Sequence, residues 1–273
     1  MDPALILGLI ILSLIAGLIG SLFGLGGGII VVPVLTVLYK METMDAIAIS
    51  LAAIAAVSAA SASVLVRNKV ANVRIGLRLE VAAAVGAMIG AIIALYVMES
   101  WVLALCFAAV MIYSAAYMFL RPERLHDPSG DRDEDFVHCD PRTGNEIHYS
   151  VRNTGTGMMG FAVAGVASAL TGVGGGAIKV PIMNVHMGIP MKVATATSSY
   201  VIGITAFSGA AVYLLSGVLD VLTAAVVILG AFIGSHIGLR ILPKLDTSSM
   251  RRYFSTVLIV LAVVMILNAG GML

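Results

Sequence analysis

Two glycine-rich motifs carry the strongest chemical signal in this sequence. One is Gly24-Leu25-Gly26-Gly27-Gly28, followed by Pro33, and the other is Gly172-Val173-Gly174-Gly175-Gly176, followed by Pro181. Glycine has no Cβ, so its amide can approach a ligand closely. At the start of a helix such amides are unpaired and lie at the positive end of the helix dipole. The motifs therefore predict an anion site, although glycines that only allow close helix packing would give the same pattern.

A lysine lies three residues beyond the second motif, in an otherwise apolar segment. This is Lys179, and the equivalent position after the first motif is Val31. A charge within a membrane usually faces a cavity or a partner. The nearest carboxylates all lie close to the expected ends of apolar segments: Asp45, Glu80, Glu99 and Asp220. We therefore expect a mobile anion as the counter-charge, unless the side chain extends to the outer interface.

Other polar side chains in the second half are weaker candidates. His236 follows Gly234-Ser235 and could relay a proton or contact the substrate, or be an ordinary hydrogen-bonded interior histidine. The hydroxyl run at 195–199 either lines a cavity or bonds back to the backbone. No catalytic residue, metal ligand or cofactor is predicted. The predicted substrate-binding residues are Gly24, Gly26, Gly27, Gly28, Thr171, Gly172, Gly174, Gly175, Gly176, Lys179, Ser198 and His236.

The composition around these residues is that of a polytopic membrane protein. The chain has 273 residues, of which 60% are hydrophobic and 11% charged, with a mean hydropathy of +1.04. Soluble domains carry roughly 25% charged residues. Most uncharged stretches reach the roughly 20 residues that a membrane-spanning helix needs. A net charge of +1 without a basic block excludes a nucleic-acid partner, and two cysteines exclude a disulfide framework.

The chain also contains an internal duplication. A shift of 148 positions makes residues 16–33 and 164–181 identical at ten of 18 positions. The same shift aligns the G-x-x-x-G pair at Gly86 and Gly90 with the pair at Gly234 and Gly238, which we interpret as helix-packing residues.

The basic residues indicate that the two repeats are inverted. Lys and Arg mark cytoplasmic loops. They occur at 67–78 but not in the equivalent loop at 216–221, and at 240–252 but not in the equivalent loop at 98–101. Equivalent loops should therefore face opposite sides of the membrane, which requires an odd number of crossings in each half. The alternative is a parallel arrangement of four spans per half with a re-entrant hairpin.

These patterns predict an all-α membrane fold of two inverted repeats, residues 1–120 and 154–273. The expected segments are 4–23, 29–40, 45–66, 75–97 and 101–119, then 155–171, 177–188, 191–215, 218–239 and 250–270. The second segment of each set is too short to span the membrane, so it should be a half-helix that follows the glycine-rich break.

Residues 121–153 form a charged insert between the repeats. We expect it to be cytoplasmic and to contain a β-hairpin with strands at 136–140 and 146–151. His138, Cys139 and His148 are either metal ligands or, since no fourth ligand has a diagnostic spacing, ordinary surface residues.

The two halves, each with G-x-G-G-G followed by a proline, resemble the sulfite exporter TauE/SafE family, also called the 4-toluene sulfonate uptake permease family. The resemblance covers the whole chain apart from 121–153. It implies transport of small sulfur-containing anions such as sulfite, sulfoacetate and other organosulfonates. The charged insert departs from compact members of the family and leaves open a regulatory or partner-binding role.

The leading prediction is a secondary transporter of small anions in the cell membrane, working by alternating access around a midplane site. An anion channel on the same scaffold is the alternative. An intramembrane enzyme would need a nucleophile–base pair or a ligand cluster at depth, and Cys106 has the surroundings of an inert core thiol. The sequence leaves open the substrate, the direction of transport, the coupling ion (H+ or Na+) and whether the protein is a homodimer.

Overall fold

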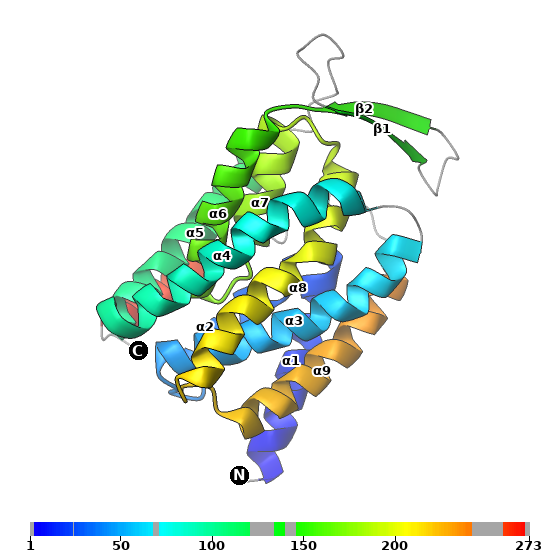
Figure 1. The fold of residues 1–273 in the computed structure, drawn as a ribbon. Coiled ribbons are helices and arrows are strands. Elements are labelled where there is room, and N and C mark those ends of the chain that lie inside the picture. Colours follow the sequence, from blue (N-terminus) through cyan, green and yellow to red (C-terminus); the bar gives the residue numbers. More distant parts are fainter. Residues whose placement is uncertain are drawn as a thin grey trace.

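The chain folds into apolar helices and one β-hairpin, as the computed structural model in Figure 1 shows. The structure describes residues 3–23, 25–67, 71–120, 134–139, 146–241 and 259–270. The helices are α1 (Pro3–Phe23), α2 (Gly28–Val37), α3 (Thr43–Arg67), α4 (Val73–Val97), α5 (Ser100–Leu120), α6 (Thr154–Thr171), α7 (Gly176–Pro181), α8 (Met191–Leu215) and α9 (Val221–Ile241). A further apolar helix covers Ile259–Ala269.

Five of these helices contain segments long and apolar enough to cross a membrane. They are Leu5–Leu22, Thr43–Leu65, Val73–Val97, Met191–Leu215 and Val221–Arg240. Helices suit such sequences because they satisfy every backbone hydrogen bond within the segment. The prediction of a multi-pass helical membrane protein is confirmed.

A short helix follows each glycine-rich break, as expected. The second one differs in form from the prediction of a helix over 177–188, because α7 ends at Pro181 and continues as a π-helix, η1 (Ile182–His186). Proline removes a backbone donor and its ring crowds the carbonyl four residues earlier, which favours a wider turn at this point. Of the segment expected at 250–270, residues 250–258 lie outside the described residues.

The helices of the two sequence halves interleave. The main packing pairs form a row in the order α6, α4, α8, α3, α9 and α1 (Figure 1). At the 148-residue shift α6 corresponds to α1, α4 to α9 and α8 to α3, so the contacts at one end of the row are repeated at the other end. Each outer pair combines one helix from each half. The two halves therefore pack mainly against each other.

Glycines at the helix contacts let the outer pairs approach closely. A Cβ on Gly86 would lie 2.1 Å from the carbonyl oxygen of Ala162, and one on Gly234 would lie 2.0 Å from that of Leu14. These two contacts are equivalent under the duplication, and Gly90 and Gly238 pack against facing backbones in the same way. The prediction that the G-x-x-x-G pairs serve packing is confirmed.

The expected hairpin lies beside the membrane helices (Figure 1). Strand β1 (Glu134–Cys139) pairs antiparallel with β2 (Glu146–Val151), and the residues between them lie outside the described part of the chain. Tyr149 is buried, and its hydroxyl accepts a hydrogen bond from Asn72 Nδ2 at 2.9 Å, next to the start of α4. Burial raises the pKa of Tyr149, and the bond from Asn72 opposes this shift. His138 and Cys139 lie in β1 and His148 in β2, and the interpretation of these residues as ordinary surface residues rather than metal ligands stays a prediction.

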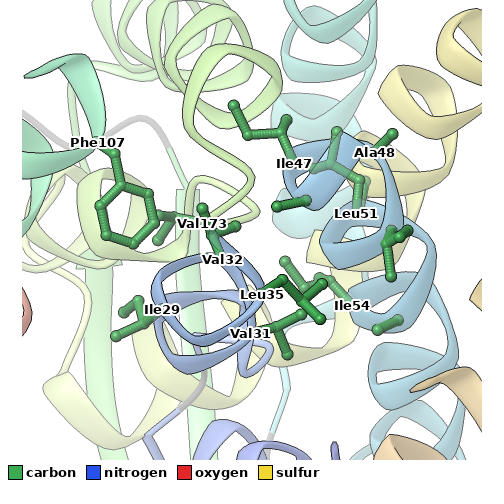
Figure 2. Close-up of a cluster of buried hydrophobic side chains, with 14 of the residues drawn as sticks. Ile29, Val31, Val32, Leu35, Ile47, Ala48, Leu51, Ile54, Phe107 and Val173 are labelled. Carbon is green, nitrogen blue, oxygen red and sulfur yellow. The ribbon is translucent and has the colours of Figure 1, made fainter. Parts of the chain in front are cut away.

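The largest buried apolar cluster surrounds α2 (Figure 2). Val32 and Leu35 of α2 pack with Ile54 of α3, while Val173 reaches α2 from the second glycine-rich break. This cluster holds a loop of the second half against a helix of the first half. It is the packing that brings the two motifs together.

Candidate functional site

The two glycine-rich loops, loop 1 (residues 25–27) and loop 2 (residues 172–175), meet inside the helical row. A Cβ on Gly28 would lie 2.1 Å from the carbonyl oxygen of Gly172, so only glycine fits at this contact. Ser50 Oγ donates to the same carbonyl at 2.7 Å. The structure therefore brings together the two motifs that the sequence singled out, although Gly24 itself lies outside the described residues.

Each loop needs glycine for its backbone conformation. Gly27 (φ 85°) and Gly175 (φ 76°) are left-handed and directly precede α2 and α7. Residues with a side chain rarely adopt this conformation. A left-handed residue followed by a helical one turns successive amides toward one side, an arrangement that binds anions. The same positive φ occurs at Gly26, Gly172 and Gly174.

The amides at the start of α7 lack acceptors. Among the described residues, the amides of Gly174, Gly175, Gly176 and Ala177 donate to no carbonyl. The next two amides, of Ile178 and Lys179, donate to the carbonyl of Gly175 at 3.0 and 2.9 Å. A helix start always leaves donors unpaired, but these lie in buried residues, where unpaired amides are rare. Loop 2 and the first turn of α7 thus present a set of donors in buried residues that have no carbonyl acceptor in the described part of the chain.

Two buried hydroxyl groups also lack a partner within the described part of the chain. They are Ser168 Oγ and Ser198 Oγ, both in residues with 0% exposure. Ser168 lies beside loop 2, because its Cβ is 3.3 Å from the position of a Cβ on Gly175. Ser198 is the repeat equivalent of Ser50. Sequence analysis missed Ser168, since a single serine inside an apolar helix carries no signal of its own.

Lys179 is bound to a carboxylate, which corrects the expectation of a mobile counter-anion. Its Nζ lies 3.0 and 2.8 Å from the two carboxylate oxygens of Glu80, and 2.6 Å from Thr205 Oγ1. Both charged side chains are buried, at 0% and 1% exposure. Glu80 is not near a helix end as expected, because α4 begins at Val73 and Glu80 lies about two turns inside it. The sequence showed neither how far Glu80 lies inside α4 nor that this face of α4 is turned toward α7.

The ammonium group of Lys179 has no donor to spare in this arrangement. A lysine carries three N–H donors, and Glu80 and Thr205 accept all three. Phe161 lies beside the cluster, with its ring centroid 5.5 Å from Nζ, and adds a cation–π contact. Direct anion binding by Lys179 therefore requires that Glu80 first release it.

The remaining predicted residues fall into different environments. Thr171 is buried, but its hydroxyl donates back to the carbonyl of Ala167 at 2.7 Å. His236 is exposed on α9, where its ring contacts Phe232 at a centroid distance of 4.9 Å. The structure therefore does not bring His236 into the buried site, where a substrate-binding role had been predicted.

The two alternatives for the hydroxyl groups at 195–199, lining a cavity or bonding back to the backbone, apply to different residues. Ser199 Oγ bonds back to the carbonyl of Thr195 at 3.0 Å. Thr197 Oγ1 accepts from the amide of Asn72 at 2.9 Å. Of this run, Ser198 is the one whose buried hydroxyl has no partner among the described residues.

Comparison with known proteins assigns the chain to a family. The family model described as sulfite exporter TauE/SafE matches residues 9–265. The probable membrane transporter protein YunE of Bacillus subtilis (strain 168) is 29% identical over 260 residues, covering 93% of this chain and 94% of the relative. The probable membrane transporter protein MJ0441 of Methanocaldococcus jannaschii is 26% identical over 278 residues, covering 95% and 94%. No solved structure matches. The chain belongs to the sulfite exporter TauE/SafE family of membrane transporters.

Proposed function

We propose that this protein is a secondary transporter of small anions that bind where the two glycine-rich loops meet. The observation that carries the proposal is the set of four amides in the buried residues 174–177, which donate to no carbonyl among the described residues, beside the Ser168 hydroxyl, which has no partner there either. Amides at a helix start favour an oxyanion, which accepts several hydrogen bonds at once. The family name supports sulfite as a substrate. We propose sulfoacetate and other organosulfonates with it, because they present similar sulfur-bound oxygens.

We also propose that the two repeats have inverted topology and that residues 121–153 are cytoplasmic. The reversal of basic residues between equivalent loops supports this. In Figure 1, α1 and α9 run in the direction opposite to their repeat equivalents α6 and α4. A site at the interface of inverted repeats can open to either side when one bundle tilts against the other. The bodies that move are then the mixed bundles α1–α9 and α4–α6, with α3 and α8 between them.

Cysteine labelling tests the topology in a background without Cys106 and Cys139. Cysteines at positions 69 and 244, which lie outside the described residues, should react only from the cytoplasmic side. A cysteine in place of Ser216, at the end of α8, should react only from the opposite side. Labelling of positions 69 and 216 from the same side would contradict inversion.

The function is tested with the purified protein in detergent and in liposomes. Binding of sulfite, thiosulfate, sulfoacetate, isethionate, taurine, sulfate and simple carboxylates is measured first. An anion that binds is then loaded into liposomes, and uptake of the labelled anion against the unlabelled one is followed. Saturable counterflow supports a carrier, whereas flux without counterflow supports the channel alternative. Failure of every anion to bind would overturn the proposal.

A further inference from the structure

We propose that Glu80 is the proton-binding site that couples proton uptake to anion binding at loop 2. The inference rests on the proposed function, because it assigns the coupling ion of the same site. In this scheme an anion and a proton from the same side of the membrane bind together. The proton neutralises Glu80, and Lys179 turns from Glu80 toward the anion.

The first support is the closed geometry of the cluster. Glu80 comes from α4, Lys179 from α7 and Thr205 from α8, so three helices meet at one ion pair. Besides Lys179, the Oε1 atom of Glu80 accepts from the Thr205 amide at 2.9 Å and from the Thr205 hydroxyl. The carboxylate is fully satisfied only while it is charged and in place, so protonation changes the contacts of all three helices.

The second support is that the fold does not need these charges for packing. The duplication places Val31, Val57 and Ile228 at the positions equivalent to Lys179, Thr205 and Glu80. Val31 and Val57 are buried, at 1% and 2% exposure. The helix arrangement is thus built with an ion pair at one site and with apolar side chains at the repeat-related site, and each site combines residues of both halves. Buried ion pairs are often no better for stability than apolar residues of similar volume, and ionisable residues inside a membrane commonly serve ion or proton pathways.

The third support is the position of Lys179 against loop 2. The Cε atom of Lys179 is 3.4 Å from the position of a Cβ on Gly175, and the Lys179 amide donates to the Gly175 carbonyl at 2.9 Å. The ammonium group is therefore one side-chain rotation from the unpaired amides. That rotation requires a loss of charge at Glu80, since Glu80 and Thr205 use all three N–H donors.

Charge balance then links the two ligands. The Glu80–Lys179 pair carries no net charge, and a monovalent anion alone would leave one uncompensated buried negative charge, which is strongly unfavourable. A proton taken up from the bulk solution, where a hydronium ion becomes water, binds the Glu80 carboxylate and restores neutrality. Lys179 keeps its proton and exchanges the carboxylate for the anion, so no covalent bond other than the O–H of Glu80 forms. Proton and anion should therefore bind with positive cooperativity.

No other ionisable group described on the elements that pack around Glu80 is placed to take this role. On α4 itself, Arg74 and Arg78 are exposed, and α6 carries no ionisable side chain. The ionisable groups of α8 are Lys192, which is exposed, Tyr200, which is half-buried, and Tyr213, whose hydroxyl bonds the Ala169 carbonyl. Beyond α7, exposed His186 pairs with Thr156. Among the described groups on these elements, Glu80 is the carboxylate that Lys179 contacts.

The test measures isethionate binding to the purified full-length chain between about pH 5 and about pH 8, because a sulfonate keeps its charge over this range. For the wild type, one linked proton predicts that the dissociation constant rises by up to about tenfold per pH unit. A pH indicator in weak buffer should report uptake of about one proton per anion bound. The Glu80→Gln variant imitates the protonated state, so its affinity should not depend on pH and its proton uptake should vanish. Glu99→Gln is the matched control, since among the described residues this exposed carboxylate bonds only the Trp101 ring N–H, at 2.5 Å. This variant should leave the wild-type pH dependence intact.

A double variant keeps the test valid if Glu80→Gln folds poorly, since that single variant retains a buried charged lysine without its carboxylate. Glu80→Ile with Lys179→Val installs the residues found at the repeat-related positions, Ile228 and Val31, and should fold at least as well as the wild type. It should show no proton uptake at any anion concentration. Proton uptake by either variant, or pH-independent binding by the wild type, would overturn the coupling role and leave the proposed transport function standing. Failure of the wild type to bind any tested anion would instead overturn the proposed function.

Discussion

Replacing Ser168 by alanine should separate anion affinity from stability. Ser168 is fully buried in α6, and its hydroxyl has no partner among the described residues. A buried unpaired polar group is unfavourable by about 1–3 kcal/mol, and alanine is the better helix former by about 0.5 kcal/mol. The substituted protein without ligand should therefore unfold at the same temperature as the wild type or at a higher one.

Anion binding by the same variant should become weaker. The Ser168 Cβ is 3.3 Å from the position of a Cβ on Gly175, beside the unpaired amides of loop 2. A hydrogen bond to a charged group contributes about 1.5–3 kcal/mol. Its loss should raise the dissociation constant by about tenfold to about a hundredfold. A change that stabilises the fold and weakens binding is what a ligand-directed hydroxyl predicts.

Thermal unfolding in detergent and calorimetric titration with isethionate or sulfite are measured on the same preparations. Ser50→Ala is the matched control, because the Ser50 hydroxyl already donates to the carbonyl of Gly172 at 2.7 Å. That variant should lose about 1 kcal/mol of stability. If Ser168→Ala binds with wild-type affinity, the hydroxyl does not face the anion. If Ser168→Ala loses as much stability as Ser50→Ala, the Ser168 hydroxyl has a partner in the folded protein, which contradicts the premise that it is unpaired.

Two further predictions concern the glycines. Gly175→Ala should lower the free energy of unfolding by about 1–2 kcal/mol because of the left-handed conformation, and by more because its Cβ would lie 2.9 Å from a carbonyl oxygen of α6. Gly217→Ala, with a φ of 78° and open space around its Cβ, should lose only the part that comes from the conformation. Equal losses in unfolding experiments would contradict the packing of loop 2. Gly234→Ala would place a Cβ 2.0 Å from a carbonyl oxygen of α1 and should lose about 1–3 kcal/mol or more, whereas Gly155→Ala, on an open helix face, should gain up to about 1 kcal/mol. A fully stable Gly234→Ala protein would contradict the α1–α9 contact.

Local patterns in the sequence were sufficient for the class of protein, the duplication and the importance of the glycine-rich breaks. Hydropathy over about 20 residues reports a membrane helix directly. A fixed shift that preserves G-x-G-G-G and its proline reports a repeat without any knowledge of the fold. The positive φ of Gly27 and Gly175 agrees with this, because only glycine adopts such a conformation freely, so the residue type itself records the backbone geometry.

The tertiary structure alone decided which residues share the site. Glu80 and Lys179 are 99 positions apart and belong to different repeats, and their pairing depends on the depth of each helix and on the face that α4 turns toward α7. Those quantities come from the interleaving of the two halves, which no local window of sequence contains. For the same reason Ser168 became a candidate while His236 was found on an exposed face. Residue type fixes what a side chain can bind, but only helix packing decides what lies within its reach.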